Sequence, residues 1–233
     1  MTAARTERSQ PGAESMFDRF YWLYAFCREH VFRDDTDLII VALWSDGRPA
    51  AEGLLLELGC GPGFYACRLA DRFDGLRVLG IDLSERQIRR AQARASLRRL
   101  GNCRFEKGNA LSLKQPTGSV NAVVASRLFT ILPNASAALG EIHRVLEPGG
   151  RCFIAEPRSA MRASVPLKAM WLLAGLMSLW APHPVSYIEP ERVRVMTGAD
   201  FVTLARSQEW MSVHTWQDHW YQYAVCEKHP ALP

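Results

Sequence analysis

The sequence has 233 residues, of which 48% are hydrophobic and 22% are charged, and its formal net charge is +4. This size suits one α/β domain with a large core, and the composition is that of a soluble globular protein. The net charge is too small to demand a nucleic-acid partner.

The six cysteines are scattered along the chain without a C-x-x-C pair: Cys27, Cys60, Cys67, Cys103, Cys152 and Cys226. This pattern argues against a zinc knuckle or a disulfide framework and favours a reducing, cytoplasmic location. No metal site is expected. Residues 1–14 are polar and carry no apolar signal segment, so we expect a disordered tail there. We expect residues 15–233 to form a single domain.

Two helices are expected before the first strand. Met16–Val31 is crowded with aromatic residues, and Thr36–Trp44 is the second helical segment. Tyr21 and Tyr24 have a polar tip as well as an aromatic body. Packing of this helix on the domain is the simpler interpretation of its aromatic residues, and a cover over a ligand is the functional one.

A short apolar segment, Leu54–Leu58, predicts a central parallel strand, and Phe64–Arg72 predicts the helix that follows it. Between them lie Gly59, Cys60, Gly61, Pro62 and Gly63, whose glycines allow a sharp turn and close approach of a ligand. A second strand, Arg77–Asp82, ends in a carboxylate, which is the position that binds ribose hydroxyls in nucleotide-binding folds.

The glycine spacing indicates which nucleotide binds. The turn reads G-x-G-x-G instead of the dinucleotide pattern G-x-G-x-x-G, and Glu57 precedes it by two residues. A carboxylate at this place repels a pyrophosphate but pairs with a cation. We therefore expect a nucleoside that carries a positive charge and no phosphate.

The next segments continue the α/β alternation. Ser84 and Gln87 form a capping box for a helix that runs to about Leu100. The many arginines of this helix could contact RNA or an anionic membrane, or more simply form a solvated helix face. No aromatic residues for base stacking are interleaved with them, which argues against binding of single-stranded nucleic acid. Cys103–Lys107 and Ser119–Ala125 are the third and fourth strands. A helix at Ala135–Leu146, a turn at Glu147–Gly150 and a fifth strand at Arg151–Glu156 follow.

Several of these segments resemble the class I S-adenosylmethionine (SAM) methyltransferases, and among them the ubiquinone/menaquinone-type small-molecule group. Glu57–Gly63 matches motif I, E-x-G-x-G-x-G, and Leu139–Arg151 matches the signature L-x-E-I-x-R-V-L-K-P-G-G-R. The resemblance covers about Phe17–Lys228. It implies a Rossmann-like, seven-stranded, mostly parallel sheet of order 3-2-1-4-5-7-6 with helices on both faces. It also implies a helical lid at residues 15–50 and SAM as cofactor, with S-adenosylhomocysteine (SAH) as product.

The resemblance also assigns roles within the expected cofactor site. Glu57 would orient the methionine amino group, and the turn with Gly59, Cys60, Gly61 and Gly63 would admit methionine and ribose. The other implied contacts are Asp82 to the ribose, Leu83 to the adenine face, Asn109 and Ala110 to its edge, and Ser126 and Arg127 at the junction of cofactor and substrate. Asn109 and Asn121 stand where the family usually has an acid.

An apolar insertion at residues 157–190 is expected after the fifth strand, with its most apolar part at 165–182. A substrate cover, a peripheral membrane surface, plain packing and a twofold contact are the alternatives for it. A short helix at Glu189–Thr197 and two closing strands, Phe201–Trp210 and Tyr221–Glu227, complete the expected order.

The implied reaction is in-line displacement of the sulfonium methyl group by a small, apolar or aromatic acceptor. The N/D-P-P-Y/F tetrad of base methyltransferases is absent after the fourth strand, which argues against nucleic acid as substrate. No histidine lies there either. The candidate bases are His183, Tyr187 and Tyr24, with His30, His214 and His219 as further candidates and Glu156 placed to face the pocket. Other chemistry on the same fold and a non-catalytic SAM-binding partner protein remain alternatives.

Overall fold

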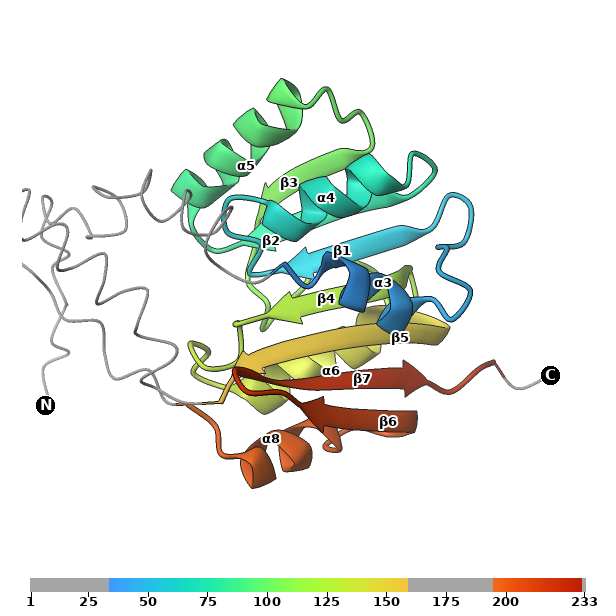
Figure 1. Cartoon of the computed structure of the whole chain (residues 1–233), viewed down its shortest axis with the longest axis vertical. Coiled ribbons are helices and arrows are strands. Elements are labelled where there is room, and N and C mark those ends of the chain that lie inside the picture. The colour runs from blue at the N-terminus through green and yellow to red at the C-terminus, as the bar shows by residue number, and fades with distance from the viewer. Residues whose placement is uncertain (1–33, 159–194, 232–233) are drawn as a thin grey trace, which may run out of the picture.

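The computed structural model describes residues 34–158 and 195–231. The expected helix Met16–Val31 and the apolar insertion, with Tyr24, His183 and Tyr187, lie outside these residues. The described chain forms one seven-stranded sheet of order β3-β2-β1-β4-β5-β7-β6, as predicted (Figure 1). The strands are β1 (Leu54–Leu58), β2 (Arg77–Asp82), β3 (Cys103–Lys107), β4 (Val120–Ser126), β5 (Leu146–Pro157), β6 (Trp210–Gln217) and β7 (Tyr221–Lys228).

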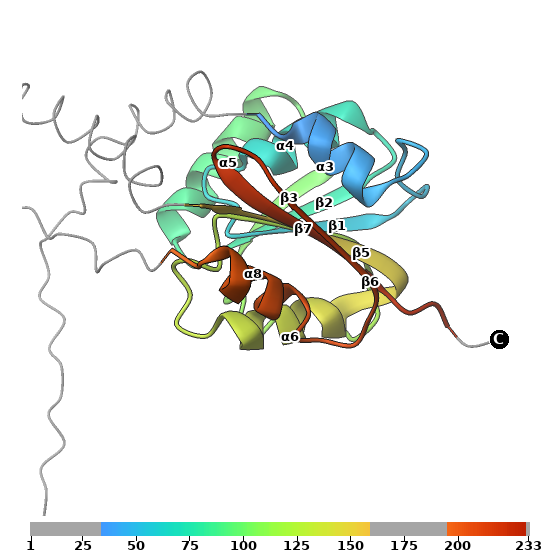
Figure 2. The same ribbon diagram turned by 60° about the horizontal axis from the view of Figure 1, so that its bottom comes forward.

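The described helices cover the two faces of this sheet (Figure 2). Helices α3 (Thr36–Leu43), α4 (Phe64–Arg72) and α5 (Glu85–Leu97) pack on one face, and α6 (Ala135–Val145) and α8 (Gly198–Ala205) on the other. Successive residues of the central strands point to opposite faces, so Leu55 belongs to one core and Leu56 to the other. None of the helices in these described ranges is long and apolar enough to cross a membrane.

The parallel strands β1 to β5 all end at one edge of the sheet (Figure 1). Strand β7 runs antiparallel to both of its neighbours, and Tyr221 at its start pairs with Pro157 at the end of β5. The β6–β7 turn therefore lies at the same edge as the carboxyl ends of the parallel strands. This is the edge at which open α/β sheets bind ligands.

Two expectations about the chain after α6 are wrong. Phe201–Trp210 is not a strand, because most of it lies in α8 and the turn that follows, and the edge strand begins at Trp210. Thr197 caps this helix: its hydroxyl oxygen accepts from the backbone N–H of Asp200 at 3.2 Å and donates to the Asp200 carboxylate. Phe201 and Leu204 then face the core at helical spacing.

The turn expected at Glu147–Gly150 is instead part of β5, as an irregular stretch. Leu146 pairs with Val120, and the next pair is Arg151 with Ala122, so the extra residues form a bulge. Lys228 closes the end of α6 here, because its ammonium group donates to the carbonyl oxygens of His143 and Leu146 at 2.7 Å each. Two boundaries also shift: α5 ends at Leu97, short of Leu100, and β4 runs from Val120 to Ser126.

Candidate functional site

The glycine-rich turn after β1 is fastened to β2. The backbone N–H groups of Gly59 and Cys60 both donate to the carbonyl oxygen of Ile81, at 2.8 and 3.1 Å. Gly59, Gly61 and Gly63 have φ angles of 65°, 51° and 72°, a left-handed conformation that other residues adopt at a cost. Glycine is therefore favoured at all three positions, where the backbone turns from β1 into α4.

The three glycines differ in what surrounds them. A Cβ on Gly63 would lie 2.7 Å from the Phe105 ring, and one on Gly59 would lie 2.9 Å from Leu128. A Cβ on Gly61 would meet nothing within 4 Å. Gly59 and Gly63 are thus required by packing inside the domain, whereas Gly61 lies beside open space at the edge of the sheet. Cys60 is buried, and burial raises the pKa of its thiol well above the usual range.

Asp82 closes this turn from the tip of β2. Its Oδ2 accepts from the backbone N–H of Gly61 at 2.9 Å, and its Oδ1 accepts from that of Ser84 at 2.8 Å. The carboxylate is held between the glycine turn and the start of α5, where the resemblance expects the ribose. Leu83, beside it, is 69% exposed, so an apolar surface is open next to the carboxylate. Contact of either residue with a cofactor stays a prediction.

Glu57 is buried under the start of α4. Its Oε2 accepts from the backbone N–H of Ala66 at 2.7 Å, one of the N–H groups that a helix leaves without a partner in its first turn. A carboxylate is also stabilised near the positive end of a helix. Glu57 therefore holds the helix against the glycine turn, and its effect on a methionine amino group stays a prediction.

The loop after β3 holds the residues expected at the adenine edge. Oδ1 of Asn109 accepts from the backbone N–H of Leu111 at 2.9 Å, and Ala110 is buried. A small cavity of about 30 Å³, lined in part by Ile81 and Asn109, adjoins this loop. An amide oxygen can accept two hydrogen bonds, so the loop contact of Asn109 leaves capacity for an adenine amino group.

Ser126 and Arg127 end β4 where the resemblance places the substrate side. Arg127 has a φ of 55°, which is unusual for a residue with a side chain. Its backbone N–H donates to the carbonyl oxygen of Ala155 at 2.7 Å, and its guanidinium lies 5.6 Å from the centre of the Tyr221 ring. The side chain is thus directed across the end of β5 to the start of β7.

Glu156, near the end of β5, is fully buried and does not face an open pocket as expected. Its Oε1 accepts from the backbone N–H of Phe129 at 2.7 Å, and its Oε2 has no hydrogen-bond partner in the described part of the chain. Burial raises the pKa of this carboxyl to about 7, against the opposite effect of the bond from Phe129. Glu156 therefore fixes the loop that follows β4. An acid at the end of an apolar strand was the sequence signal for it.

Two of the further candidate bases lie in the described chain, both in the β6–β7 hairpin. The His214 ring stacks on Trp216 with their centres 5.3 Å apart, and His219 meets the edge of Trp220 in the turn. His143 in α6 contacts the edge of the Trp210 ring. The contact of His214 is a packing contact, and His143 also forms a hydrogen bond with the carbonyl oxygen of Glu209 at 3.1 Å. None of these three histidines lies on a strand or loop next to the glycine turn.

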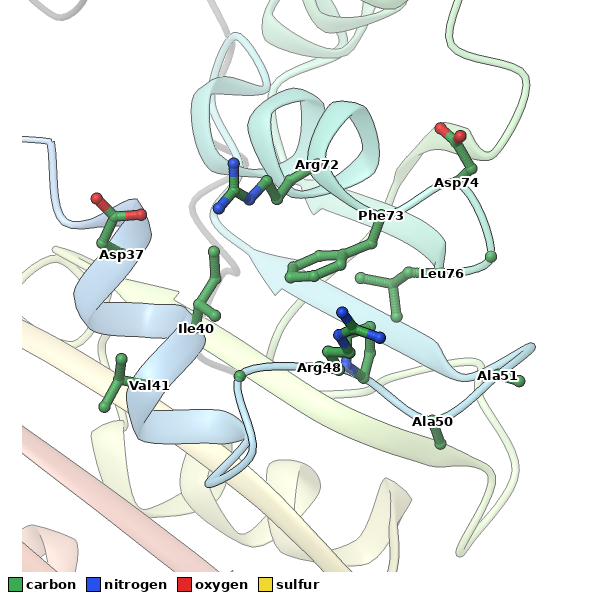
Figure 3. Close-up of a pocket in the computed structure, with 13 residues that line it drawn as sticks. Asp37, Ile40, Val41, Arg48, Ala50, Ala51, Arg72, Phe73, Asp74 and Leu76 are labelled. Atoms are coloured by element: carbon green, nitrogen blue, oxygen red, sulfur yellow. The ribbon is translucent and has the colours of Figure 1, made fainter.

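A cavity of about 860 Å³ lies at the other edge of the sheet, between α3 and the loops that precede β1 and β2 (Figure 3). Ile40, Phe73 and Leu76 form its apolar wall. Arg48, from the loop before β1, and Arg72, from the end of α4, also line it. It contains none of the predicted site residues. The candidate site is therefore the carboxyl edge with the glycine turn and Asp82.

Known proteins resemble the part of the chain that holds this candidate site. Residues 55–150 match a family model described as "Methyltransferase domain". The matched range includes the glycine turn, Asp82, Asn109 and Arg127. These matched residues form a SAM-dependent methyltransferase domain. The predictions of family and fold class are thus confirmed, and SAM is the cofactor of the family.

Two relatives of this methyltransferase domain are enzymes named for small organic molecules. The chain is 29% identical to nocamycin O-methyltransferase of Saccharothrix syringae, over 79% of this chain and 64% of that protein. It is 36% identical to demethylmenaquinone methyltransferase of Thermus thermophilus, over 44% of this chain and 46% of that protein. The matches thus span less than two thirds of these two curated relatives.

Among solved structures, a SAM-dependent methyltransferase from Methanosarcina mazei is similar to this methyltransferase domain in fold. It superposes with a TM-score of 0.56 at 21% identity, over 80% of this chain and 97% of that one. At this identity the likeness supports the fold alone, and the assignment of residues depends on the geometry described above.

Proposed function

We propose that the protein transfers the methyl group of SAM to a small, apolar or aromatic molecule. One observation carries the proposal: the Asp82 carboxylate is bound to the backbone of Gly61, beside the open side of the glycine turn. A carboxylate at this position can accept from both hydroxyls of a ribose. A cofactor without phosphate, as the glycine spacing predicts, suits a turn that already has two carboxylates near it, Glu57 and Asp82.

SAM supplies an activated methyl group on a sulfonium ion when it is bound. Bound SAM would present its methyl carbon for in-line attack by the acceptor atom, and the electron pair of the broken carbon–sulfur bond would stay on the sulfur of SAH. The chain's task is to align donor and acceptor and to exclude water. The turn at Gly61 and the carboxylate of Asp82 would hold the donor, and the loop after β4, anchored by Glu156, would form the acceptor side.

A small organic acceptor is supported by two observations. The segment Ser126–Leu132 lacks the N/D-P-P-Y/F tetrad of base methyltransferases. The two curated relatives are named for small organic molecules. Contact of residues 165–182 with a membrane or a second copy is a separate expectation that this proposal does not need.

Calorimetric titration tests the cofactor. We expect SAM and SAH to bind the wild-type chain and the Asp82→Ala variant to lose binding by at least about a hundredfold, because two charge-assisted hydrogen bonds are removed. Asp74→Ala is the matched control, since Asp74 lines the cavity at the other edge of the sheet. Failure of the wild-type chain to bind either compound contradicts the proposal.

Labelled SAM separates methyl transfer from the alternatives. With the label on the methyl carbon, methyl transfer moves the label to the acceptor and leaves unlabelled SAH. Decarboxylation or aminopropyl transfer would leave the label on the sulfur. A non-catalytic SAM-binding protein would return SAM unchanged with every acceptor, and that result would contradict the enzymatic proposal while leaving cofactor binding intact.

A further inference from the structure

The cavity of about 860 Å³ lies at the amino edge of the sheet, where the parallel strands begin (Figure 3). A cavity of this size can hold a small organic ligand. Helix α4 follows the glycine turn and ends at Arg72, which lines this cavity. The cavity and the proposed SAM site therefore lie at opposite ends of one helix, and the proposed methyl transfer does not use the cavity.

The loops that wall the cavity are held together by hydrogen bonds. The backbone N–H of Glu52 donates to the carbonyl oxygen of Gly75 at 3.1 Å, which joins the loop before β1 to the loop before β2. The side-chain amide of Asn102 donates to the carbonyl oxygens of Phe73 and Leu76 at 3.1 and 2.9 Å. The shape of the cavity is thus formed before a ligand arrives, which lowers the entropic cost of binding.

Apolar side chains from two elements line the cavity. Ile40 and Val41 come from α3, and Phe73 and Leu76 come from the loop after α4. Ile40 and Leu76 are buried, whereas Val41 is 70% exposed and Phe73 is partly exposed. The Phe73 ring is held by an edge contact with Trp44, with the ring centres 5.6 Å apart. Apolar surface left open in a cavity favours a ligand with an apolar or aromatic body.

Two guanidinium groups line the same cavity, from Arg48 in the loop before β1 and Arg72 at the end of α4 (Figure 3). Both side chains are exposed. Within residues 34–158 and 195–231, neither guanidinium has a hydrogen-bond or ion-pair partner, and the contact of Arg48 with Asp46 is made by its backbone N–H. Each guanidinium can therefore bind an anion without giving up a partner among these residues.

Two carboxylates also line the cavity, and neither forms an ion pair with an arginine of the cavity in the described part of the chain. Asp37 lies in the first turn of α3, where the positive end of the helix offsets a negative charge. Figure 3 shows Asp74 on the opposite side, with its carboxylate directed away from the Phe73 ring. The positive charges of Arg48 and Arg72 are therefore not matched by contacts with these acids.

We propose that this cavity, with Val41, Arg48, Arg72 and Phe73 as its contact residues, binds an organic carboxylate that has an apolar or aromatic body. A planar guanidinium matches the two oxygens of a carboxylate and can form two parallel hydrogen bonds with it. The body of the ligand would lie against Phe73 and Val41. The inference goes beyond the proposed function, because this site shares no residue with the glycine turn or Asp82.

Calorimetric titration of the full chain with 2-naphthoate and the neutral 2-naphthamide tests the inference. We expect naphthoate to bind at least about tenfold more tightly than naphthamide, because only the carboxylate forms charge-assisted hydrogen bonds. The double variant Arg48→Gln/Arg72→Gln should bind the two probes equally. Val41→Ser should weaken both probes, because it removes apolar contact from the ligand's body. Both arginines are exposed, so these variants should remain folded, and thermal unfolding checks this.

Arg89→Gln is the matched control, since it removes a guanidinium that pairs with Glu85 on the exposed side of α5. This variant should keep the wild-type preference for naphthoate. Equal binding of the two probes by the wild type, no binding of naphthoate, or a preference for naphthoate that survives in the double variant overturns the inference.

Amide NMR spectra of the labelled chain locate the bound probe. Naphthoate should shift the backbone signals of Val41, Ala51 and Gly75 and leave those of Gly61 and Asp82 in place. Shifts at Gly61 and Asp82 alone would place naphthoate in the proposed SAM site and contradict the inference. The proposed function is judged separately, by SAH binding and by transfer of the labelled methyl group.

Discussion

Asn121 joins the amino ends of three neighbouring strands through one side chain. Its Oδ1 accepts from the backbone N–H of Leu54 at 2.5 Å, and its Nδ2 donates to the Glu147 carboxylate. An aspartate could accept from Leu54 but would place a second negative charge against Glu147. The amide at this place, where the family usually has an acid, is therefore matched to the glutamate in the irregular part of β5.

Glu156 is a residue whose ionisation should be visible in the stability of the whole chain. Its carboxyl pKa is about 7 in the folded chain and has an ordinary value of 4.5. The folded state therefore binds the proton more tightly than the unfolded state. The stabilisation from this group is complete below about pH 4.5 and is lost as the pH rises to about 7, in total about 3 kcal/mol.

Replacing Glu156 by glutamine removes the ionisation but keeps an oxygen that can accept from Phe129. We expect the free energy of unfolding of Glu156→Gln to depend less on pH between 5 and 8 than that of the wild type. The variant should match or exceed the wild type at pH 8. Urea unfolding at a series of pH values measures this difference, and two parallel curves would show that Glu156 is not the titrating group.

At the scale of elements, the glycines of the turn between β1 and α4 have two different roles. Some are required because the domain packs closely around them, and one leaves room for a ligand. Gly63 precedes α4 and lies against Phe105 from β3 and Ala91 from α5, so it joins three elements. Gly61 has the same backbone conformation but open space beside it. The two positions therefore form a matched pair, in which only the surroundings differ.

We expect Gly63→Ala to destabilise the chain by about 3 kcal/mol or more, since the backbone cost adds to the clash with Phe105. Gly61→Ala should cost only about 1–2 kcal/mol, which is the backbone term alone. Gly61→Ala should nevertheless weaken SAH binding, because its methyl group enters the space beside Asp82. Chemical unfolding and calorimetric titration measure the two effects, and equal loss of stability in both variants would contradict the division of roles.

Elements with a strong local pattern could be predicted from the sequence, and those that depend on distant contacts could not. The strands β1 and β2 and the helix α4 lie as predicted, because glycine and the apolar run mark their ends. Helix α8 was expected to be a strand, although Thr197 and Asp200 form a cap at its start and Phe201 and Leu204 recur at helical spacing. The apolar residues of the segment fit both the period of a helix and that of a strand. The cap at Thr197 is the feature that identifies the helix.

The same distinction holds within the site. The positions of Gly61 and Asp82 follow from motif spacing, and the structure brings them into contact. The bond from Phe129 to Glu156, and the contact of Arg127 with Tyr221, join residues far apart in sequence. Their positions depend on the sheet order, which places the end of β5 between β4 and β7. No local pattern in the chain encodes such a contact.

At the scale of the whole molecule, the central strands belong to two cores at once. Leu55 and Val124 contribute to the core under α3, α4 and α5, and Leu56 and Val123 to the core over α6 and α8. Loss of either core exposes the strands that the other core needs, so we expect the described chain to unfold in one cooperative transition. A ligand held across the tips of β1 and β2 would stabilise both cores together.

This coupling leads to a prediction for thermal unfolding. SAH at a hundred times its Kd should stabilise the folded chain by about 2.7 kcal/mol, because it binds only the folded state. For a chain of 233 residues this corresponds to a rise in Tm of roughly 5–10 °C. NAD at the same concentration should leave Tm unchanged, because the G-x-G-x-G turn with Glu57 and Asp82 beside it repels a pyrophosphate. Circular dichroism measures both shifts. An equal rise with NAD would show that the turn binds nucleotides without regard to charge, and the argument from glycine spacing to SAM would then fail.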